Sequence, residues 1–275
     1  MSGEEFMATY QYLEVEQRGA VRWIWLNRPE FRNAFNDGLV ADISAAFAAV
    51  EAASDTRVVV VAGRGPAFCA GADLNWMRSM AALVDTDKGH ADNHADALKV
   101  ARMFQAVHSC SKPVIGRIQG DAFGGGVGLA AACDIVVAVE SAGFVLSEVK
   151  LGLVAATISP HVVRAMGARE AARYMLTAEK FDAARARELG LVQEVVAAAA
   201  LDAEVERLVG HLLAASPAAL AATKRLLADV VEAPLDDVLL AATAKCIADA
   251  RVSPEGREGI AAFLDKRAPA WAPKK

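Results

Sequence analysis

The N-terminal part of the chain alternates between polar and apolar positions before it becomes helical. Residues 12–18 and 20–26 alternate around Gly19, a pattern that predicts a β-hairpin with one buried face. Apolar residues then recur with helical spacing from about Asp37 to Ala53, and the β-branched run 58–62 predicts a buried strand. Because a helix precedes that strand, we expect the strand to be parallel to its neighbour, as in an α/β fold.

The middle of the chain repeats the order of strand, turn and helix. Residues 75–93 have mixed polarity and predict a mobile or gating segment, and a helix is expected at 95–109. Apolar runs at 113–119 and 134–140 predict two further strands. From Pro160 onward the spacing is almost wholly helical, with breaks at glycine and proline.

This change of pattern predicts two units. We expect a core over residues 1–200 and a helical oligomerisation region over residues 201–275. The abundance of alanine and leucine in the second unit suits helices that pack on one another, including across subunits.

A run of three glycines, residues 124–126, lies where a predicted strand gives way to a predicted helix. Without Cβ atoms the backbone can approach a ligand closely, and the first turn of a helix offers free N–H groups with a partial positive charge. A second loop of small residues, 63–74, follows the predicted strand at 58–62, and ligand sites in α/β folds gather at such strand ends. The alternative for the glycines is a tight turn with close helix packing.

Three charged residues are candidates for chemistry. Arg28 and Arg32 lie in a polar loop and would either hold a phosphate or be ordinary surface arginines. Glu148 falls just beyond a short predicted strand, among apolar neighbours that disfavour its charged form. Such a carboxyl suits proton transfer near neutral pH, and the alternative is a residue that merely starts a helix.

Composition narrows the class of protein. Hydrophobic residues make up 55% of the chain and charged residues 23%, which favours a globular protein over a disordered one. The net charge of −5 gives no support for nucleic-acid binding. Four cysteines without paired spacing predict reduced thiols and no metal site. The acidic residues 1–7 do not resemble a signal peptide, and no long uncharged apolar run predicts a membrane span, so we expect a cytoplasmic protein.

The loops Ala67–Leu74 and Gly120–Asp134 together resemble the signature of the enoyl-CoA hydratase/isomerase (crotonase) superfamily. Residues 26–29, 183–192 and 258–267 match that family too, so the resemblance extends from about residue 10 to 270. It implies a crotonase-like α/β spiral of ββα units followed by a C-terminal helical trimerisation region. It also implies an acyl-CoA thioester substrate, homotrimers that usually stack into hexamers, and no cofactor beyond the coenzyme A of the substrate.

The resemblance assigns roles to individual residues. The backbone N–H groups of Ala72 and Gly125 would form an oxyanion hole for the thioester oxygen, and Glu148 would move a proton at the substrate's α-carbon. Coenzyme A would lie near loops 27–33 and 63–70. The residues expected to bind substrate or coenzyme A are Arg28, Phe31, Arg32, Ala70, Gly71, Asp73, Leu74, Gly124, Gly128 and, from a neighbouring subunit, Lys266.

One position departs from the pattern of ordinary enoyl-CoA hydratases. Their second catalytic glutamate would fall at Gly128, where this chain has no carboxylate. Three alternatives follow: a hydratase that uses Glu148 alone, a Δ3-Δ2-enoyl-CoA isomerase with one carboxylate, or a non-catalytic acyl-CoA-binding protein. If only a base is missing, Gly128→Glu is expected to raise the hydration of crotonyl-CoA.

Longer strings resemble one branch of the family. Residues 68–77, 146–167 and 250–271 look like the bacterial 3-methylglutaconyl-CoA hydratases of leucine breakdown, and a related branch hydrates isohexenylglutaconyl-CoA. Both substrates carry a free carboxylate, which could help to position water if a basic side chain held it. The candidates for that anchor are Arg78, Lys150 and His161, each of which could instead be a plain surface residue.

Overall fold

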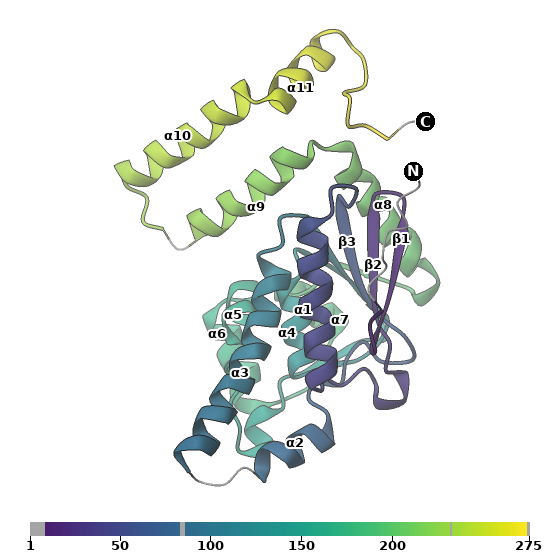
Figure 1. The fold of residues 1–275 in the computed structure, drawn as a ribbon, viewed down its shortest axis with the longest axis vertical. Helices are drawn as coiled ribbons and strands as arrows, with labels where there is room; N and C mark the ends of the chain where they lie inside the picture. The colour runs from purple at the N-terminus through teal and green to yellow at the C-terminus, as the bar shows by residue number, and fades with distance from the viewer. Residues whose placement is uncertain (1–8, 83–85, 232, 274–275) are drawn as a thin grey trace.

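A six-stranded sheet runs through the body of the protein in the computed structural model, which describes residues 9–82, 86–231 and 233–273 (Figure 1). Its order is β1-β2-β3-β4-β6-β9, with β1 and β2 antiparallel and the other neighbours parallel. The predicted hairpin and the predicted parallel strand are therefore confirmed. The strands are β1 (Leu13–Arg18), β2 (Val21–Leu26), β3 (Val58–Gly63), β4 (Val114–Ile118), β6 (Ile135–Val139) and β9 (Glu194–Val196).

A second, smaller sheet consists of β5 (Ala122–Phe123), β7 (Gly143–Val145) and β8 (Phe181–Asp182) in the order β5-β7-β8. Strand β5 lies inside the glycine-rich stretch and is parallel to β7, and the Gly124 N–H donates to the Val145 carbonyl at 2.8 Å. This pairing holds the start of the glycine run beside the segment that leads into Glu148.

Two long helices cover one face of the large sheet (Figure 1). Helix α1 (Asp37–Ala52) begins at Asn36, whose side chain accepts from the Leu39 N–H, and it buries an apolar stripe. Helix α3 (Asp87–His108) packs beside α1 and is capped by Thr86. Helix α2 (Leu74–Ala81) and the first turns of α3 lie in the segment 75–93 that was expected to be mobile or gating, and the helix expected at 95–109 begins earlier, at Asp87.

Shorter helices complete the body. Helix α4 (Gly125–Ala132) follows the glycine run and packs on α3 and on α5 (Ser159–Met166). The others are α6 (Ala168–Thr177), α7 (Ala183–Glu188) and α8 (Leu201–Ala214), with the 3-10 turns η1 (Pro29–Phe31), η2 (Glu148–Leu151) and η3 (Ala198–Ala200). Helix α8 buries Leu201 and Val205 and contacts β3, β4 and β6, so it packs with the core sheet.

The last three helices form a C-terminal arm, defined here as α9 (Pro217–Val231), α10 (Asp237–Val252) and α11 (Pro254–Leu264). The arm stands off the body at the end opposite α2 (Figure 1). In their described residues α9 and α10 bury no side chain, and large apolar side chains such as Leu235 and Phe263 are more than 80% exposed. No helix in the described ranges could span a membrane. Residues 1–7, which do not resemble a signal peptide in sequence, lie outside those ranges.

Candidate active site

The two loops of small residues meet at backbone distance. Phe123 N donates to the Cys69 carbonyl at 2.9 Å, which joins the second loop to the strand that leads into the glycines. Gly71 has φ +85°, and a Cβ there would lie 2.8 Å from the Phe123 carbonyl oxygen and 3.6 Å from the Gly125 nitrogen. A larger residue at position 71 would therefore force the two loops apart.

The two expected oxyanion-hole donors lie on these adjoining loops. Phe35 forms a parallel bridge opposite Ala72 through the Gly71 carbonyl at 2.7 Å and the Asp73 N–H at 2.8 Å, so the Ala72 N–H faces away from Phe35. Gly125 is the first residue of α4, whose opening N–H groups have no carbonyl within the helix to accept them. Both N–H groups lack a backbone acceptor among the described residues.

Glu148 lies against the start of the same glycine run. It begins η2 and is half-buried, and its Oε1 would be 3.0 Å from a Cβ on Gly124, whose φ is +49°. Its Oε2 is buried and meets no hydrogen-bond partner within the described chain. Burial raises the pKa of the Glu148 carboxyl, against a smaller lowering from its own backbone N–H. A carboxyl of this kind can both accept and return a proton.

Gly128 is packed against another helix. A Cβ on Gly128 would lie 2.1 Å from Ile158 Cγ2 and 3.4 Å from Phe104 Cζ. The residue is buried inside α4, and its missing side chain allows α5 to approach. The addition of a base by Gly128→Glu therefore meets a steric obstacle, because a glutamate cannot be added there without displacing Ile158. The expected contact between Gly128 and substrate stays a prediction.

Arg28 and Asp73 form a buried ion pair at 3.0 Å, with 5% and 6% of their surfaces exposed. The Arg28 guanidinium also donates to the Ala34 carbonyl and lies over the rings of Tyr12 and Phe31. Desolvation raises the pKa of Asp73, but hydrogen bonds from the start of α2 and from Arg28 lower it further, so the carboxylate stays ionised. The two residues thus have a structural role as a buried ion pair, and the expected contact of either with coenzyme A stays a prediction.

Asn33, which sequence reasoning did not single out, joins the two loops expected to hold coenzyme A. Its Nδ2 donates to the Arg64 carbonyl at 2.8 Å and the Ala67 carbonyl at 3.0 Å, and its Oδ1 accepts from Arg28 N at 2.9 Å. Asn33 is fully buried with φ +56°, and Arg32 beside it has φ +49°. The only signal in the sequence is an asparagine in a turn-rich loop, which is too common to be informative.

A cavity of about 210 Å³ lies between these loops. Exposed Arg32 is at one side, and the Ala70 N–H donates to the Arg32 carbonyl at 2.9 Å. The position matches the place expected for coenzyme A. The residues that line the cavity are Arg32, Pro66, Ala67, Ala70, Asp121 and Phe123.

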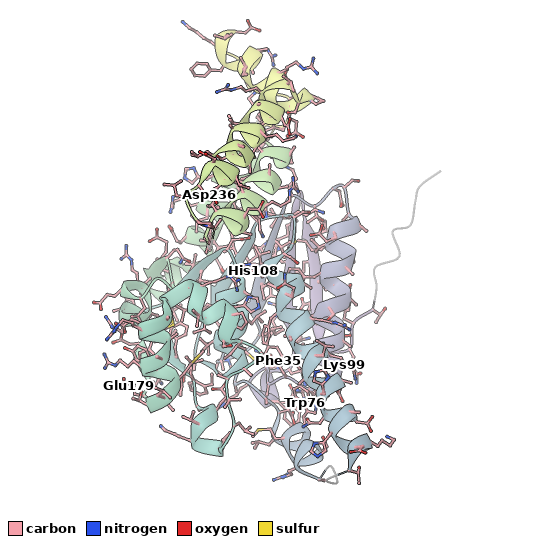
Figure 2. The ribbon with its side chains drawn as sticks, turned by 90° about the vertical axis from the view of Figure 1, so that its left-hand side faces the viewer. Phe35, Trp76, Lys99, His108, Glu179 and Asp236 are labelled. Atoms are coloured by element: carbon pink, nitrogen blue, oxygen red, sulfur yellow. The ribbon has the colours of Figure 1, made fainter. Side chains whose placement is uncertain are left out.

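Three expected contact residues have exposed side chains. Phe31 is 49% exposed and Leu74 is 69% exposed, both on the loops that surround Asp73. Lys266 follows α11 with φ +52°, on the C-terminal arm. Figure 2 places Trp76 near the end of the molecule away from Asp236, the N-cap residue of α10, and Phe35 in the lower half of the body. The arm of one chain therefore lies away from its own Phe35 loop, and a role for Lys266 requires a neighbouring subunit.

The three candidate anchors for a substrate carboxylate differ in their surroundings. Lys150 Nζ donates to the Ala178 carbonyl at 2.8 Å, which closes the end of α6. His161 is 5% exposed, and burial, with His108 and Arg164 nearby, lowers its pKa to about 4. Arg78 is exposed on α2 and donates to Asn75 Oδ1 at 3.0 Å. Arg78 and Lys150 are thus both exposed, and they differ in that the Lys150 ammonium group is held by a backbone carbonyl.

The part of the chain that the structure describes contains no group of three or more acidic, histidine or cysteine residues that could hold a metal ion. Cys69, Cys110 and Cys133 are free thiols whose pKa burial raises.

Comparison with known proteins agrees with this geometry. The model of a family described as enoyl-CoA hydratase/isomerase matches residues 16–274. An enoyl-CoA hydratase structure from Shewanella pealeana is 40% identical with a TM-score of 0.90, over 94% of this chain and 96% of that one. Pseudomonas aeruginosa AtuE is 34% identical with a TM-score of 0.89, over 96% and 100%.

Relatives found by sequence comparison also include enoyl-CoA hydratases. The enoyl-CoA hydratase ACTT6 of Alternaria alternata is 38% identical over 216 residues, which are 78% of this chain and 68% of that protein. These relatives support an enzyme, so the non-catalytic alternative is set aside. The chain belongs to the enoyl-CoA hydratase/isomerase family, has the crotonase fold, and is an enzyme of the enoyl-CoA hydratase type.

Proposed function

We propose that this enzyme adds water to a branched 2-enoyl-CoA that carries a distal carboxylate, with 3-methylglutaconyl-CoA as its substrate. The observation that carries the proposal is the position of Glu148: a half-buried carboxyl with a raised pKa, against Gly124, the residue that precedes Gly125 at the start of α4. The position of a second carboxylate, at Gly128, is closed by Ile158. One carboxyl must therefore serve both proton transfers.

The proposed reaction uses backbone donors and one side chain. The thioester oxygen accepts hydrogen bonds from Ala72 and Gly125, and each well-aimed donor of this kind is worth roughly 2.7–4 kcal/mol in the transition state. Ionised Glu148 takes a proton from water while the water oxygen bonds to the β-carbon, and the π electrons move to form the enolate. Protonated Glu148 then returns the proton to the α-carbon. Water is thereby added to one face, and the carboxylate is regenerated.

The distal carboxylate of the substrate would take over the positioning of water, which Gly128 cannot do because it has no side chain. Held by a cation, it would place the attacking water next to Glu148, and Arg78 is the anchor we favour because Lys150 caps α6 and His161 is buried and neutral. The measurement is kcat/KM for 3-methylglutaconyl-CoA and for crotonyl-CoA, in the parent and in Arg78→Ala. Exposed Arg207 on α8 provides a matched control, Arg207→Ala.

The parent is expected to prefer 3-methylglutaconyl-CoA by at least about tenfold, the value of one charge-assisted contact. Arg78→Ala is expected to lose most of this preference, and Arg207→Ala to keep it. Equal specificity constants for the two esters in the parent would refute the substrate. A preference that survives in Arg78→Ala would refute the anchor alone.

Two alternatives use the same site. Isohexenylglutaconyl-CoA also carries a free carboxylate, and a longer acyl group that gives the higher kcat/KM would favour it. A Δ3-Δ2-enoyl-CoA isomerase would move a proton between two carbons with Glu148 alone, and the absence of a carboxylate at Gly128 favours that reading. Its product has the mass of the substrate, whereas hydration adds one water.

We also propose that the enzyme is a homotrimer, or a hexamer built from two trimers. The C-terminal arm supports this, because it exposes many large apolar side chains close together in the chain, and exposed apolar patches mark interaction surfaces. Light scattering is expected to give a trimer or a hexamer, and a monomer would contradict the assignment. The exposed apolar residues of the arm are Leu227, Val231, Leu235, Val238, Leu240, Ile247, Val252, Ile260, Phe263 and Leu264.

A further inference from the structure

Lys180 lies at the edge of the cavity between the coenzyme A loops. Its Nζ is 3.4 Å and 3.5 Å from the two carboxylate oxygens of Asp121 and 5.9 Å from the ring centroid of Phe123. Asp121 and Phe123 both line the cavity, and the Lys180 side chain is 57% exposed. The ammonium group is thus beside the cavity and open to solvent.

The path of the Lys180 side chain depends on a glycine in the neighbouring strand. A Cβ on Gly143 would lie 2.0 Å from Lys180 Cε and 2.6 Å from its Nζ, so any other residue in β7 would displace the lysine. The Gly143 N–H donates to Asp121 Oδ1 at 2.8 Å, which fixes the carboxylate beneath the ammonium group. The small sheet therefore directs Lys180 across β7 to the cavity.

The cations beside the cavity, Lys180 and Arg32, keep hydrogen-bond donors that can bind an anion. Charge-assisted hydrogen bonds between nitrogen and carboxylate are typically about 2.7–2.9 Å, so the Lys180–Asp121 contact is a long one. Asp121 already accepts from Gly143, and an ammonium group has further N–H donors to offer. At the other side of the cavity Arg32 makes no ion pair with any residue that the structure describes. Two cations thus lie at a cavity whose lining includes one carboxylate, that of Asp121.

We propose that Lys180 is a phosphate-binding residue that, with Arg32, holds a phosphate group of the coenzyme A moiety. The inference rests on the proposed acyl-CoA substrate and adds a residue that neither the loop motifs nor the family resemblance indicates. Asp121 holds the ammonium group at the edge of the cavity, and the phosphate accepts from the N–H donors of Lys180 that the long Asp121 contacts leave available.

The test compares ligands with and without phosphate groups. Calorimetric titration of the parent, Lys180→Ala and Lys180→Arg with free coenzyme A gives a measure of binding that does not depend on turnover. The same variants are assayed with an enoyl-CoA and with the same acyl group on pantetheine, which lacks every phosphate. Exposed Lys245 of α10 provides a matched control, Lys245→Ala.

Lys180→Ala is expected to weaken coenzyme A binding and raise KM for the enoyl-CoA by about tenfold, the loss of one charge-assisted contact, with kcat unchanged. KM for the pantetheine ester should not change, and Lys180→Arg should retain binding. Unchanged affinity for coenzyme A, or an equal rise in KM for both esters, would overturn the proposal. If the parent binds coenzyme A but converts neither ester, the proposed hydration fails while the binding test still stands.

Discussion

Ile158 occupies the space that a side chain at position 128 would need, since a Cβ on Gly128 would lie 2.1 Å from Ile158 Cγ2. The contact joins α4, which begins with the proposed oxyanion-hole donor Gly125, to Ile158, the N-cap residue of α5. The chain therefore lacks both the second carboxylate and the space for it, so replacing Gly128 alone does not restore a second base. An added base would need a cavity before it could act.

Gly128→Glu alone is expected to destabilise the protein by about 1–3 kcal/mol, as overpacking of a buried site does. It should not raise crotonyl-CoA hydration, whereas Gly128→Glu with Ile158→Ala gives the carboxylate room. Urea unfolding and crotonyl-CoA turnover of the single and double variants measure both effects. A stable single variant with faster crotonyl-CoA hydration would show that Ile158 is no obstacle.

Gly124 is expected to tolerate no side chain, because its φ is +49° and a Cβ would lie 3.0 Å from Glu148 Oε1. Gly124→Ala should lower kcat by roughly 10–100-fold, since small displacements of a catalytic group have large effects. Gly210 of α8 offers a matched control, because a Cβ there meets nothing within 4 Å. Steady-state kinetics should show parent activity for Gly210→Ala. Parent activity in Gly124→Ala would remove the argument from close contact.

The pH dependence of the reaction follows from the raised pKa of Glu148. As the proposed base it must be ionised, so kcat/KM should fall on the acid side with a midpoint above the 4.5 of an ordinary glutamate. The free energy of unfolding depends on pH in the opposite direction to the activity. Folded protein binds the Glu148 proton more tightly than unfolded protein, so the contribution of Glu148 to stability is present at low pH and is lost as pH rises through the raised pKa. An acid limb at or below 4.5 would contradict the assignment.

His161 is expected to make the fold sensitive to acid. Its pKa in the folded protein is about 4, below the 6.5 of an ordinary histidine, chiefly because it is buried. Its contribution to stability is present above pH 6.5 and is lost as pH falls towards 4. Urea unfolding between these values should show a smaller fall for His161→Phe than for the parent. His161→Phe fills a similar volume, and an unchanged slope would place the acid sensitivity elsewhere.

Local patterns were sufficient to predict the main elements. The alternation around Gly19, the helical spacing from Asp37 and the apolar run at 58–62 each correspond to an element of the fold. Glu148 and the two small-residue loops were also predicted as parts of the site, because burial of a carboxyl and the absence of Cβ atoms have direct chemical meaning, and the structure brings them close together. These features depend on residues close together in the chain.

The features that were missed depend on residues far apart. Arg28 and Asp73 are 45 positions apart, and no local sequence pattern shows that they form a buried ion pair. Strands β5, β7 and β8 are two or three residues long, too short for a period to be visible. Ile158, at the N-terminus of α5, occupies the space beside Gly128 in α4. The spacing of residues along one helix could not predict this contact.

The central claim is that Glu148, working alone beside the Ala72 and Gly125 donors, adds water to the enoyl thioester. Mass spectrometry of the product from 3-methylglutaconyl-CoA, with the parent and with Glu148→Gln, tests it most directly. A gain of one water with the parent, and at least about a hundredfold slower gain with a Glu148→Gln variant that still binds the ester, is the result expected for loss of the proton-transfer group. A product of unchanged mass whose double bond has moved, or a Glu148→Gln variant that hydrates at the parent's rate, would contradict the claim.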